Sequence, residues 1–322
     1  VVAMRRIRSD MQEPGDQSKP AGERWPPRLP ELSDELYVGF RDMLRERSGL
    51  HYPERKRGDL AHGLSRAMHS GGYTDLEALY ADASAKGPGW EIVLAHLTVG
   101  ETYFFRNRPQ FAALENHILP ELIERRKTIR SLRFWSAACA TGEEPYSLAM
   151  MVGDKLPHDE FWQTSILATD INQRFLARAR EGVYGEWSFR ETSDEQRARF
   201  WTPEGNRWRL QAAIRRMVVF ARLNLAEPTY PAIANGTCAM DIIFCRNVMI
   251  YFDEATIRQV LERLYGALAP GGWLFVGHAE PQVGLFSQFE VHNFPSAIIY
   301  RKPLDAPPFT PNLADVTFDP GA

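Results

Sequence analysis

Residues 132–147 of this chain read Leu-Arg-Phe-Trp-Ser-Ala-Ala-Cys-Ala-Thr-Gly-Glu-Glu-Pro-Tyr-Ser. The apolar run at 132–137 predicts a β-strand, and Pro145 suits the first turn of a helix that follows it. The small residues between strand and helix would let the backbone approach a ligand closely. Two acidic residues, Glu143 and Glu144, open the helix, so this segment differs from the glycine-rich fingerprint that binds a pyrophosphate. They either complement the helix dipole or face a positively charged ligand.

Short apolar runs continue to alternate with helical patterns downstream of this segment. Further strands are predicted at 165–169, 217–221, 241–245 and 273–277. This alternation is typical of an α/β fold with a doubly wound, mostly parallel sheet that has helices on both faces.

Two parts of the pattern depart from simple alternation. The runs at 289–293 and 297–301 flank a short Phe-Pro-Ser turn, which predicts an antiparallel pair at one edge of the sheet. Between residues 184 and 218, a predicted helix precedes two strand-like pieces at 207–211 and 213–220. We therefore expect a small insertion of antiparallel strands in this interval.

The segment that precedes the sheet has helical periodicity. Leu36, Phe40 and Leu44 recur at helical spacing, and Ser33 is a suitable N-cap. The stretch from residue 41 to residue 66 holds seven basic and four acidic residues. It fits a solvated helix face and a docking face for an acidic partner equally well.

Composition limits the class of protein. The 322 residues include 44% hydrophobic and 25% charged residues, as in a globular protein, and the length suggests two domains. A net charge of -3 disfavours nucleic acid as the main partner. The three cysteines have no zinc-binding spacing, so we expect no metal site and a reducing compartment. No apolar run approaches the roughly 18–20 residues that span a bilayer. Residues 1–30 are predicted to be a disordered leader, and residues 303–322 a C-terminal tail.

Polar side chains follow the predicted parallel strands at the points where these strands end. Asp170 follows the second strand, Asn224 the third and Asn247 the fourth. Ligands of open parallel sheets bind outside the carboxyl ends of the strands, and an acid after the second strand can accept both ribose hydroxyls of a nucleoside. An N-cap role would also explain Asp170 alone. Together these residues predict a site for a nucleoside-type cofactor.

The motifs of the chain resemble those of the CheR family, the chemotaxis receptor methyltransferases, over nearly all of residues 32–302. The matching segments are 101–106, 135–147, 168–171, 179–184, 224–225, 244–253 and 277–280. The resemblance implies an all-helical N-terminal domain over residues 31–112. It also implies a class I methyltransferase domain over residues 113–302, with a β-subdomain inserted at about 185–220.

The function implied by the resemblance is that of a cytoplasmic protein-glutamate O-methyltransferase in chemotaxis signal transduction. Family members transfer the methyl group of S-adenosyl-L-methionine to glutamate side chains on the cytoplasmic helical domain of chemoreceptors. The products are a glutamate methyl ester and S-adenosyl-L-homocysteine. We expect no nucleic acid partner and no direct membrane insertion, since membrane proximity comes through the receptor.

The resemblance also assigns the site residue by residue. The cofactor is expected to be bound by Thr102, Arg106, Glu144, Asp170, Asn224, Leu225, Arg246 and Asn247. Asp170 would hold the ribose, Glu144 would lie near the methionine part, and Asn224 and Leu225 would flank the adenine. Arg106 and Tyr251 would lie closest to the transferred methyl group and are the expected catalytic residues.

Two glycines depart from the family pattern. Gly100 stands where most members have an Asn that contacts the cofactor. One lost neutral hydrogen bond costs about 0.5–1.5 kcal/mol, so we expect cofactor binding to be weaker by about tenfold at most. Gly63 stands where a cation is expected in the basic stretch, which weakens the expectation of receptor docking there.

The expected reaction needs no general base, because a glutamate with a pKa of about 4.3 is already ionised at pH 7. His278 and Glu280 fit an acid/base pair, but we favour a hydrogen-bonded structural pair at a strand end. Two other functions stay open, namely methylation of another protein or a small molecule on the same fold, and a cofactor-binding adaptor without turnover. A nicotinamide dehydrogenase is disfavoured by the absence of the glycine fingerprint.

Overall fold

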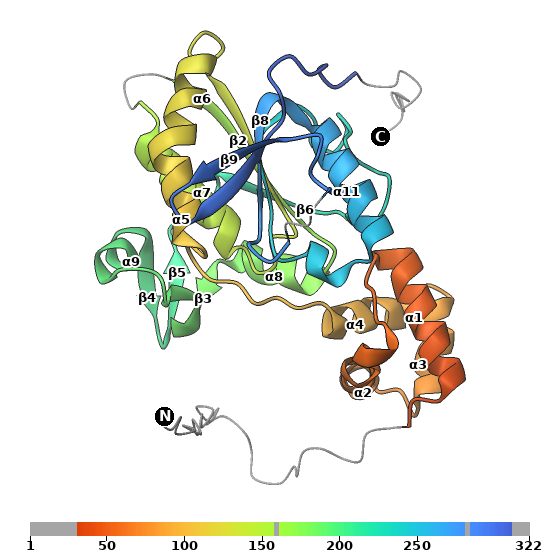
Figure 1. Ribbon diagram of the computed structural model, residues 1–322. Coiled ribbons are helices and arrows are strands. Elements are labelled where there is room, and N and C mark those ends of the chain that lie inside the picture. The colour runs from red at the N-terminus through yellow and green to blue at the C-terminus, as the bar shows by residue number, and fades with distance from the viewer. Residues whose placement is uncertain (1–30, 158–160, 281–283, 311–322) are drawn as a thin grey trace, which may run out of the picture.

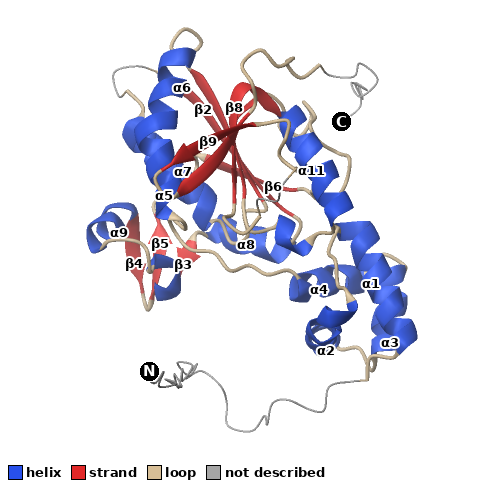
Figure 2. Cartoon of the chain, viewed as in Figure 1, coloured by secondary structure: helices blue, strands red, loops and turns tan. Residues whose placement is uncertain are grey.

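The computed structural model describes residues 31–157, 161–280 and 284–310 (Figure 1). The leader expected at 1–30 and most of the expected tail lie outside these ranges. A large mixed sheet with helices on both sides forms one part of the molecule, and a group of helices lies beside the lower end of that sheet (Figure 2).

The N-terminal region is helical, as predicted. It contains α1 (Asp34–Ser48), α2 (Arg57–Gly71), α3 (Leu76–Ser84) and α4 (Pro88–Leu97). The hydroxyl of Ser33 accepts a hydrogen bond from the Leu36 N–H, which confirms the N-cap. The apolar stripes of these helices, including Phe40 and Leu44, are buried in a common core.

Gly63 lies inside this core and not on the basic surface. A Cβ at this position would lie 2.2 Å from a side-chain carbon of Leu97. The glycine therefore lets α2 pack closely on α4, and the expectation of a surface cation at this position is wrong because the position faces the neighbouring helix.

The main sheet has seven strands in the order β6-β2-β1-β7-β8-β10-β9. Their bounds are β1 (Ser131–Ala137), β2 (Gln163–Asp170), β6 (Val218–Arg222), β7 (Met240–Cys245), β8 (Leu268–Val276), β9 (Glu290–Phe294) and β10 (Ala297–Arg301). The first five of these strands pair in parallel, and β10 pairs antiparallel with β8 and β9. The predicted parallel strands and the predicted antiparallel edge are both confirmed.

Helices cover both faces of the sheet and build two cores. They are α5 (Arg108–Ala113), α6 (Leu119–Arg126), α7 (Glu143–Lys155), α8 (Gln173–Glu181) and α11 (Glu254–Ala267). Neighbouring residues of β1 point to opposite sides, so Phe134 belongs to one core and Trp135 to the other. The near-continuous burial of the central strands follows from this two-sided cover.

The predicted insertion is a three-stranded antiparallel sheet in the order β3-β5-β4. Its strands are β3 (Val183–Tyr184), β4 (Trp201–Glu204) and β5 (Arg207–Leu210), and α9 (Asp194–Phe200) precedes β4.

One strand of this insertion was assigned incorrectly from the sequence. The expected strand at 213–220 does not exist as one piece, because α10 (Ala212–Arg215) is helical and Val218 begins β6 of the main sheet. The partners of β5 are instead β3 and β4, and neither was predicted, because β3 has only two residues and β4 contains Pro203. Proline removes a ladder hydrogen bond and is tolerated because β4 is an edge strand.

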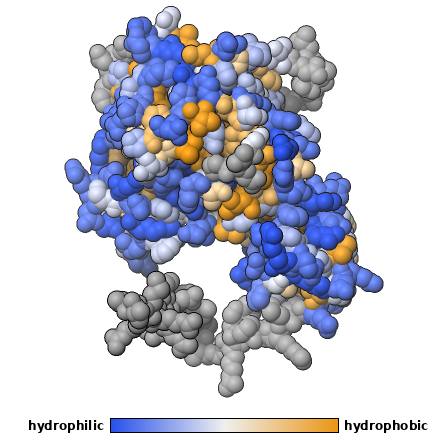
Figure 3. All heavy atoms as spheres, viewed as in Figure 1, coloured by the Kyte–Doolittle hydropathy of each residue, from blue (hydrophilic) through white to orange (hydrophobic). Residues whose placement is uncertain are grey.

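The surface is predominantly hydrophilic over the N-terminal helices, and hydrophobic residues gather near the middle of the sheet region (Figure 3). Val291 on β9 and Ile298 on β10 are among the exposed large apolar side chains. Within the described ranges, no helix has both the length and the apolar character needed to cross a membrane.

Candidate functional site

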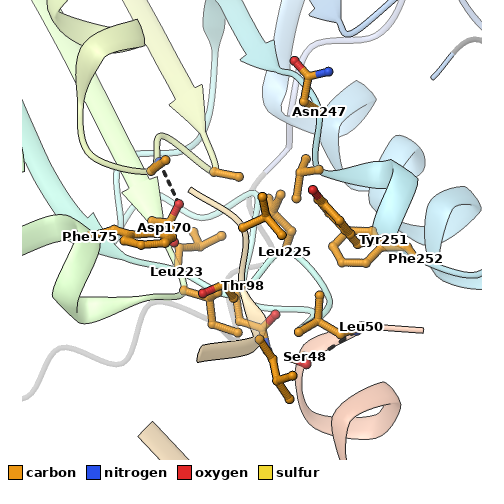
Figure 4. Close-up of a pocket in the computed structure, with 17 residues that line it drawn as sticks. Ser48, Leu50, Thr98, Asp170, Phe175, Leu223, Leu225, Asn247, Tyr251 and Phe252 are labelled. Carbon is orange, nitrogen blue, oxygen red and sulfur yellow. Dashed lines mark hydrogen bonds between the residues drawn. The ribbon is translucent and has the colours of Figure 1, made fainter. Parts of the chain in front are cut away.

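A cavity lies at the carboxyl ends of the parallel strands, where the sheet meets the N-terminal helices (Figure 4). The segments that follow β1, β2, β6 and β7 contribute to its wall, and so do the end of α1 and the segment after α4. Its lining residues are Ser48, Leu50, Leu97, Thr98, Val99, Ala138, Ala140, Asp170, Ile171, Phe175, Leu223, Asn224, Leu225, Asn247, Val248, Tyr251 and Phe252. Both parts of the chain therefore build one site.

The loop between β1 and α7 curls around the carboxylate of Asp170. Ala138, Ala140 and Gly142 have positive φ angles of 62°, 47° and 95°. The Ala140 N–H donates to Asp170 Oδ2 at 2.8 Å, and the Asn172 N–H donates to Oδ1 at 2.8 Å. A Cβ at Gly142 would lie 2.8 Å from the Cβ of Ala179, so the tight curl also requires glycine there.

Asp170 is only 6% exposed, although it lines the cavity. Burial raises the pKa of its carboxyl group to about 6, and the hydrogen bonds from Asn172 and Ala140 only partly offset this effect. The carboxylate is therefore ionised at neutral pH, and two hydroxyl donors of a ligand could use its remaining lone pairs.

Asn224 and Leu225 are among the lining residues, but the Asn224 amide is already engaged in hydrogen bonds within the protein. Its Nδ2 donates to the Arg47 carbonyl at 2.7 Å and to Glu227 Oε1 at 3.1 Å, and its Oδ1 accepts from the Ala226 N–H at 3.0 Å. Asn224 thus ties the end of α1 to the loop that follows β6.

Asn247 and Tyr251 reach the cavity from the turn after β7. This turn is held by the buried carboxylate of Glu280, which accepts from the N–H groups of Val248 and Met249 at 2.8 Å each and of Gly277 at 2.5 Å. His278 is exposed, and no hydrogen bond joins it to Glu280. The two residues therefore do not form the pair that the sequence suggested, and Glu280 alone is structural.

Glu144 and Arg246 form a buried ion pair beside the cavity and are not among its lining residues. Arg246 Nε donates to Glu144 Oε2 at 2.7 Å, and the Ser136 hydroxyl donates to Glu144 Oε1 at 2.7 Å. Arg246 Nη1 also donates to the Arg106 carbonyl at 2.7 Å and to Gln110 Oε1 at 2.9 Å. This network joins β1, α7 and the turn after β7 to the segment around Arg106.

Arg106 and Thr102 lie on the segment that joins α4 to α5, outside the cavity lining. The Arg106 guanidinium donates to the Glu101 carbonyl at 2.5 Å. Burial raises the pKa of Tyr251, and the positive charge of Arg106 opposes this shift.

Phe175 is a lining residue that the sequence did not reveal. A Cβ at Gly100 would lie 2.5 Å from Cζ of the Phe175 ring, so the ring occupies the space that a side chain at position 100 would need. Figure 4 shows this ring beside Asp170. Nearby, Asn172 Nδ2 donates to the Thr98 hydroxyl at 2.7 Å. No local pattern predicts these contacts, because they depend on how the segment after α4 docks on α8.

The chain matches known proteins over most of its length. A family model described as "CheR methyltransferase, SAM binding domain" matches residues 100–298. "Chemotaxis protein methyltransferase 1" of Pseudomonas aeruginosa is 34% identical over 274 residues, which cover 81% of this chain and 96% of that protein. The "Probable chemotaxis protein methyltransferase" of Rhizobium etli is 35% identical over 248 residues, or 74% of this chain and 89% of that protein. The "Chemotaxis protein methyltransferase" of Escherichia coli is 32% identical over 256 residues, or 77% and 85%.

Proposed function

This chain belongs to the CheR methyltransferase family, and from this we propose that it methylates glutamate side chains of chemoreceptors. It is a chemotaxis methyltransferase that uses S-adenosyl-L-methionine. The observation that best supports a functional site is the buried carboxylate of Asp170 at the end of β2, which lines a cavity at the ends of four strands. We propose that the enzyme acts in the cytoplasm, on the cytoplasmic helical domain of its receptors.

We further propose how the residues of the cavity hold the cofactor. Asp170 accepts hydrogen bonds from the ribose hydroxyls, while Leu225 and the backbone of Asn224 contact the adenine. The Glu144–Arg246 pair supports the wall near the methionine part. We also propose the segments 31–112 and 113–302 as the two domains, so that the cofactor lies where they meet.

S-adenosyl-L-methionine supplies an electrophilic methyl group on a sulfonium. The residues of the chain need only hold and orient the substrate carboxylate, which is ionised at neutral pH. Arg106 can bind one carboxylate oxygen and present the other. Tyr251 is protonated at neutral pH, because the pKa of a tyrosine is about 10 and burial raises it further. Its hydroxyl can therefore donate a second hydrogen bond. Orientation and exclusion of water then account for the rate.

The proposed reaction is tested by incubating the purified chain with methyl-labelled S-adenosyl-L-methionine and a panel of chemoreceptor cytoplasmic fragments. A glutamate methyl ester releases labelled methanol in mild alkali, whereas a methylated amine does not. Alkali-labile label on at least one fragment supports the proposal. Label that is stable to alkali, or no transfer to any fragment, contradicts it.

Replacing Arg106 with alanine is expected to lower kcat/KM for the receptor fragment by roughly 10- to 150-fold. The reason is the loss of one hydrogen bond to a charged group, which is worth about 1.5–3 kcal/mol. Arg106→Lys keeps the charge but not the planar pair of donors, so it should recover only part of the activity. Full turnover of Arg106→Ala at saturating receptor would show that Arg106 does not hold the carboxylate.

The affinity for S-adenosyl-L-homocysteine is expected to depend on pH through Asp170. The ribose hydroxyls donate to the ionised carboxylate, so protons compete with the ligand below the pKa of about 6. Affinity should be level above pH 7 and fall by up to about tenfold per pH unit below pH 6. Calorimetric titration from pH 5 to pH 8 measures this, and Asp170→Asn should remove the pH dependence. A level profile in the unmodified chain would contradict the role of Asp170.

Introducing asparagine at position 100 is expected to weaken cofactor binding, because the new side chain collides with the Phe175 ring. Overpacking of this kind costs about 1–3 kcal/mol. The double variant Gly100→Asn/Phe175→Val should bind S-adenosyl-L-homocysteine more tightly than the single variant. Gly58→Asn is the control, since a Cβ at Gly58 meets nothing within 4 Å. Tighter binding by Gly100→Asn alone would refute the collision.

A further inference from the structure

A stack of aromatic and cationic side chains lies on the surface beside the segment that carries Arg106. The guanidinium carbon of Arg190 is 3.5 Å from the ring centroid of Tyr103 and 4.1 Å from that of Trp187. Arg190 Nη1 also donates to the Trp187 carbonyl at 2.9 Å, and Nη2 lies 3.4 Å from Glu101 Oε1. These contacts hold the Arg190 guanidinium between the two rings.

This stack leads from the surface toward the proposed methyl-transfer site. Trp187 and Ser188 lie in the short turn that follows β3, and the Phe104 N–H donates to the Ser188 carbonyl at 3.0 Å. On the inner side, the Arg106 guanidinium lies 5.7 Å from the Tyr103 ring centroid. Figure 1 shows that the segment between α4 and α5 runs between the helical region and the three-stranded sheet. The stack therefore lies next to Arg106, one of the two proposed catalytic residues.

Folding alone does not account for this arrangement. Trp187 is 68% exposed, so its ring adds little to either core. Exposed tryptophan, tyrosine and arginine are the residue types that dominate protein–protein binding energy. Positive charge exceeds negative charge at the stack. Arg190 lies near the Glu101 carboxylate, whereas the Arg106 guanidinium donates to the main-chain carbonyl of Glu101 and has no carboxylate partner in the described part of the chain. Such a surface complements an acidic polypeptide.

We propose that Trp187, Arg190 and Tyr103 form a docking surface for an acidic segment of the protein substrate, next to the glutamate that is methylated. The Trp187 ring packs on the substrate chain, and Arg190 pairs with a carboxylate that neighbours the methylated residue. This inference rests on the proposed function, since the surface serves the same reaction.

The test compares Trp187→Ala and Arg190→Gln in the full chain, with a chemoreceptor cytoplasmic fragment that the unmodified enzyme methylates. The KM for the fragment is expected to rise about tenfold in each variant, the size of effect that a central interface residue produces. The kcat and the Kd for S-adenosyl-L-homocysteine should stay within about twofold. Arg190→Gln should also reduce the salt dependence of KM, because it removes a charge from the interface.

Ile129→Ala is the matched control. Ile129 is 60% exposed and precedes the amino end of β1, so it lies at the opposite edge of the sheet. Unchanged KM in both stack variants would overturn the proposal while the proposed function stands. A Kd for S-adenosyl-L-homocysteine that weakens together with KM would also overturn it, since the stack would then support the cofactor cavity. An unmodified enzyme that methylates no fragment refutes the proposed function itself.

Discussion

Replacing Asp170 with alanine is expected to abolish measurable binding of S-adenosyl-L-homocysteine at micromolar concentrations. The substitution removes the carboxylate that accepts hydrogen bonds from two ribose hydroxyls. Hydrogen bonds to a charged group are worth about 1.5–3 kcal/mol each. A combined loss of about 3–6 kcal/mol corresponds to roughly 10²–10⁴ in Kd. The substitution also releases the N–H groups of Ala140 and Asn172, which shape the loop around the ligand.

Calorimetric titration of the purified variant measures this loss directly. Asp75→Ala is a suitable control, because Asp75 also accepts a backbone hydrogen bond, from the Ala78 N–H at 2.8 Å, but caps α3 away from the cavity. The control should bind the ligand as the unmodified chain does. If Asp170→Ala retains full affinity, the nucleoside does not lie at the end of β2.

Replacing Arg246 with methionine is expected to lower the free energy of unfolding by about 3–5 kcal/mol. This substitution leaves the buried Glu144 carboxylate without its cation, and an unpaired buried charge is costly. The Arg106 carbonyl and Gln110 Oε1 lose a donor at the same time. Denaturant unfolding monitored by circular dichroism gives the free energy.

The double variant Glu144→Gln/Arg246→Met shows how much of the lost stability comes from the unpaired charge of Glu144. Removing both charges should restore a large part of the lost stability, because a buried pair is worth little compared with neutral residues that fill the same space. Glu254→Gln is the surface control. Its i,i+4 partner Arg258 is exposed, so the loss should be only about 0.3–0.5 kcal/mol. Equal losses at the two sites would show that Glu144 is hydrated.

The strands and the ends of the strands were predictable from the sequence, since both follow from local patterns. Buried apolar runs located β1, β2, β6, β7 and β8, and the polar residues after them included Asp170 and Asn247. The short strand β4 was missed, because four residues that include Pro203 carry no alternation signal. Parallel-sheet topology then explains why residues so far apart in the chain meet at one edge.

The lining residues that come from the N-terminal helical region could not be predicted in the same way. Ser48, Leu50 and Thr98 line the cavity only because α1 and the segment after α4 dock against the sheet. The close approach of Phe175 to Gly100 and the pairing of Glu144 with Arg246 are likewise tertiary contacts. The sequence shows these residue types, but which residues they contact depends on how distant segments of the chain pack together.

The hydrogen bonds that join the helical region to the sheet surround the cavity itself. Asn224 binds the Arg47 carbonyl, Asn172 binds Thr98, and the His51 N–H donates to the Tyr251 carbonyl at 2.8 Å. A ligand bound in this cavity would contact both the helical region and the sheet. Its binding would therefore raise the free energy of unfolding. Ligand at a hundred times its Kd adds about 2.7 kcal/mol by mass action. The methyl donor and its product would therefore both stabilise the folded protein. Its free energy of unfolding would rise with the concentration of either one.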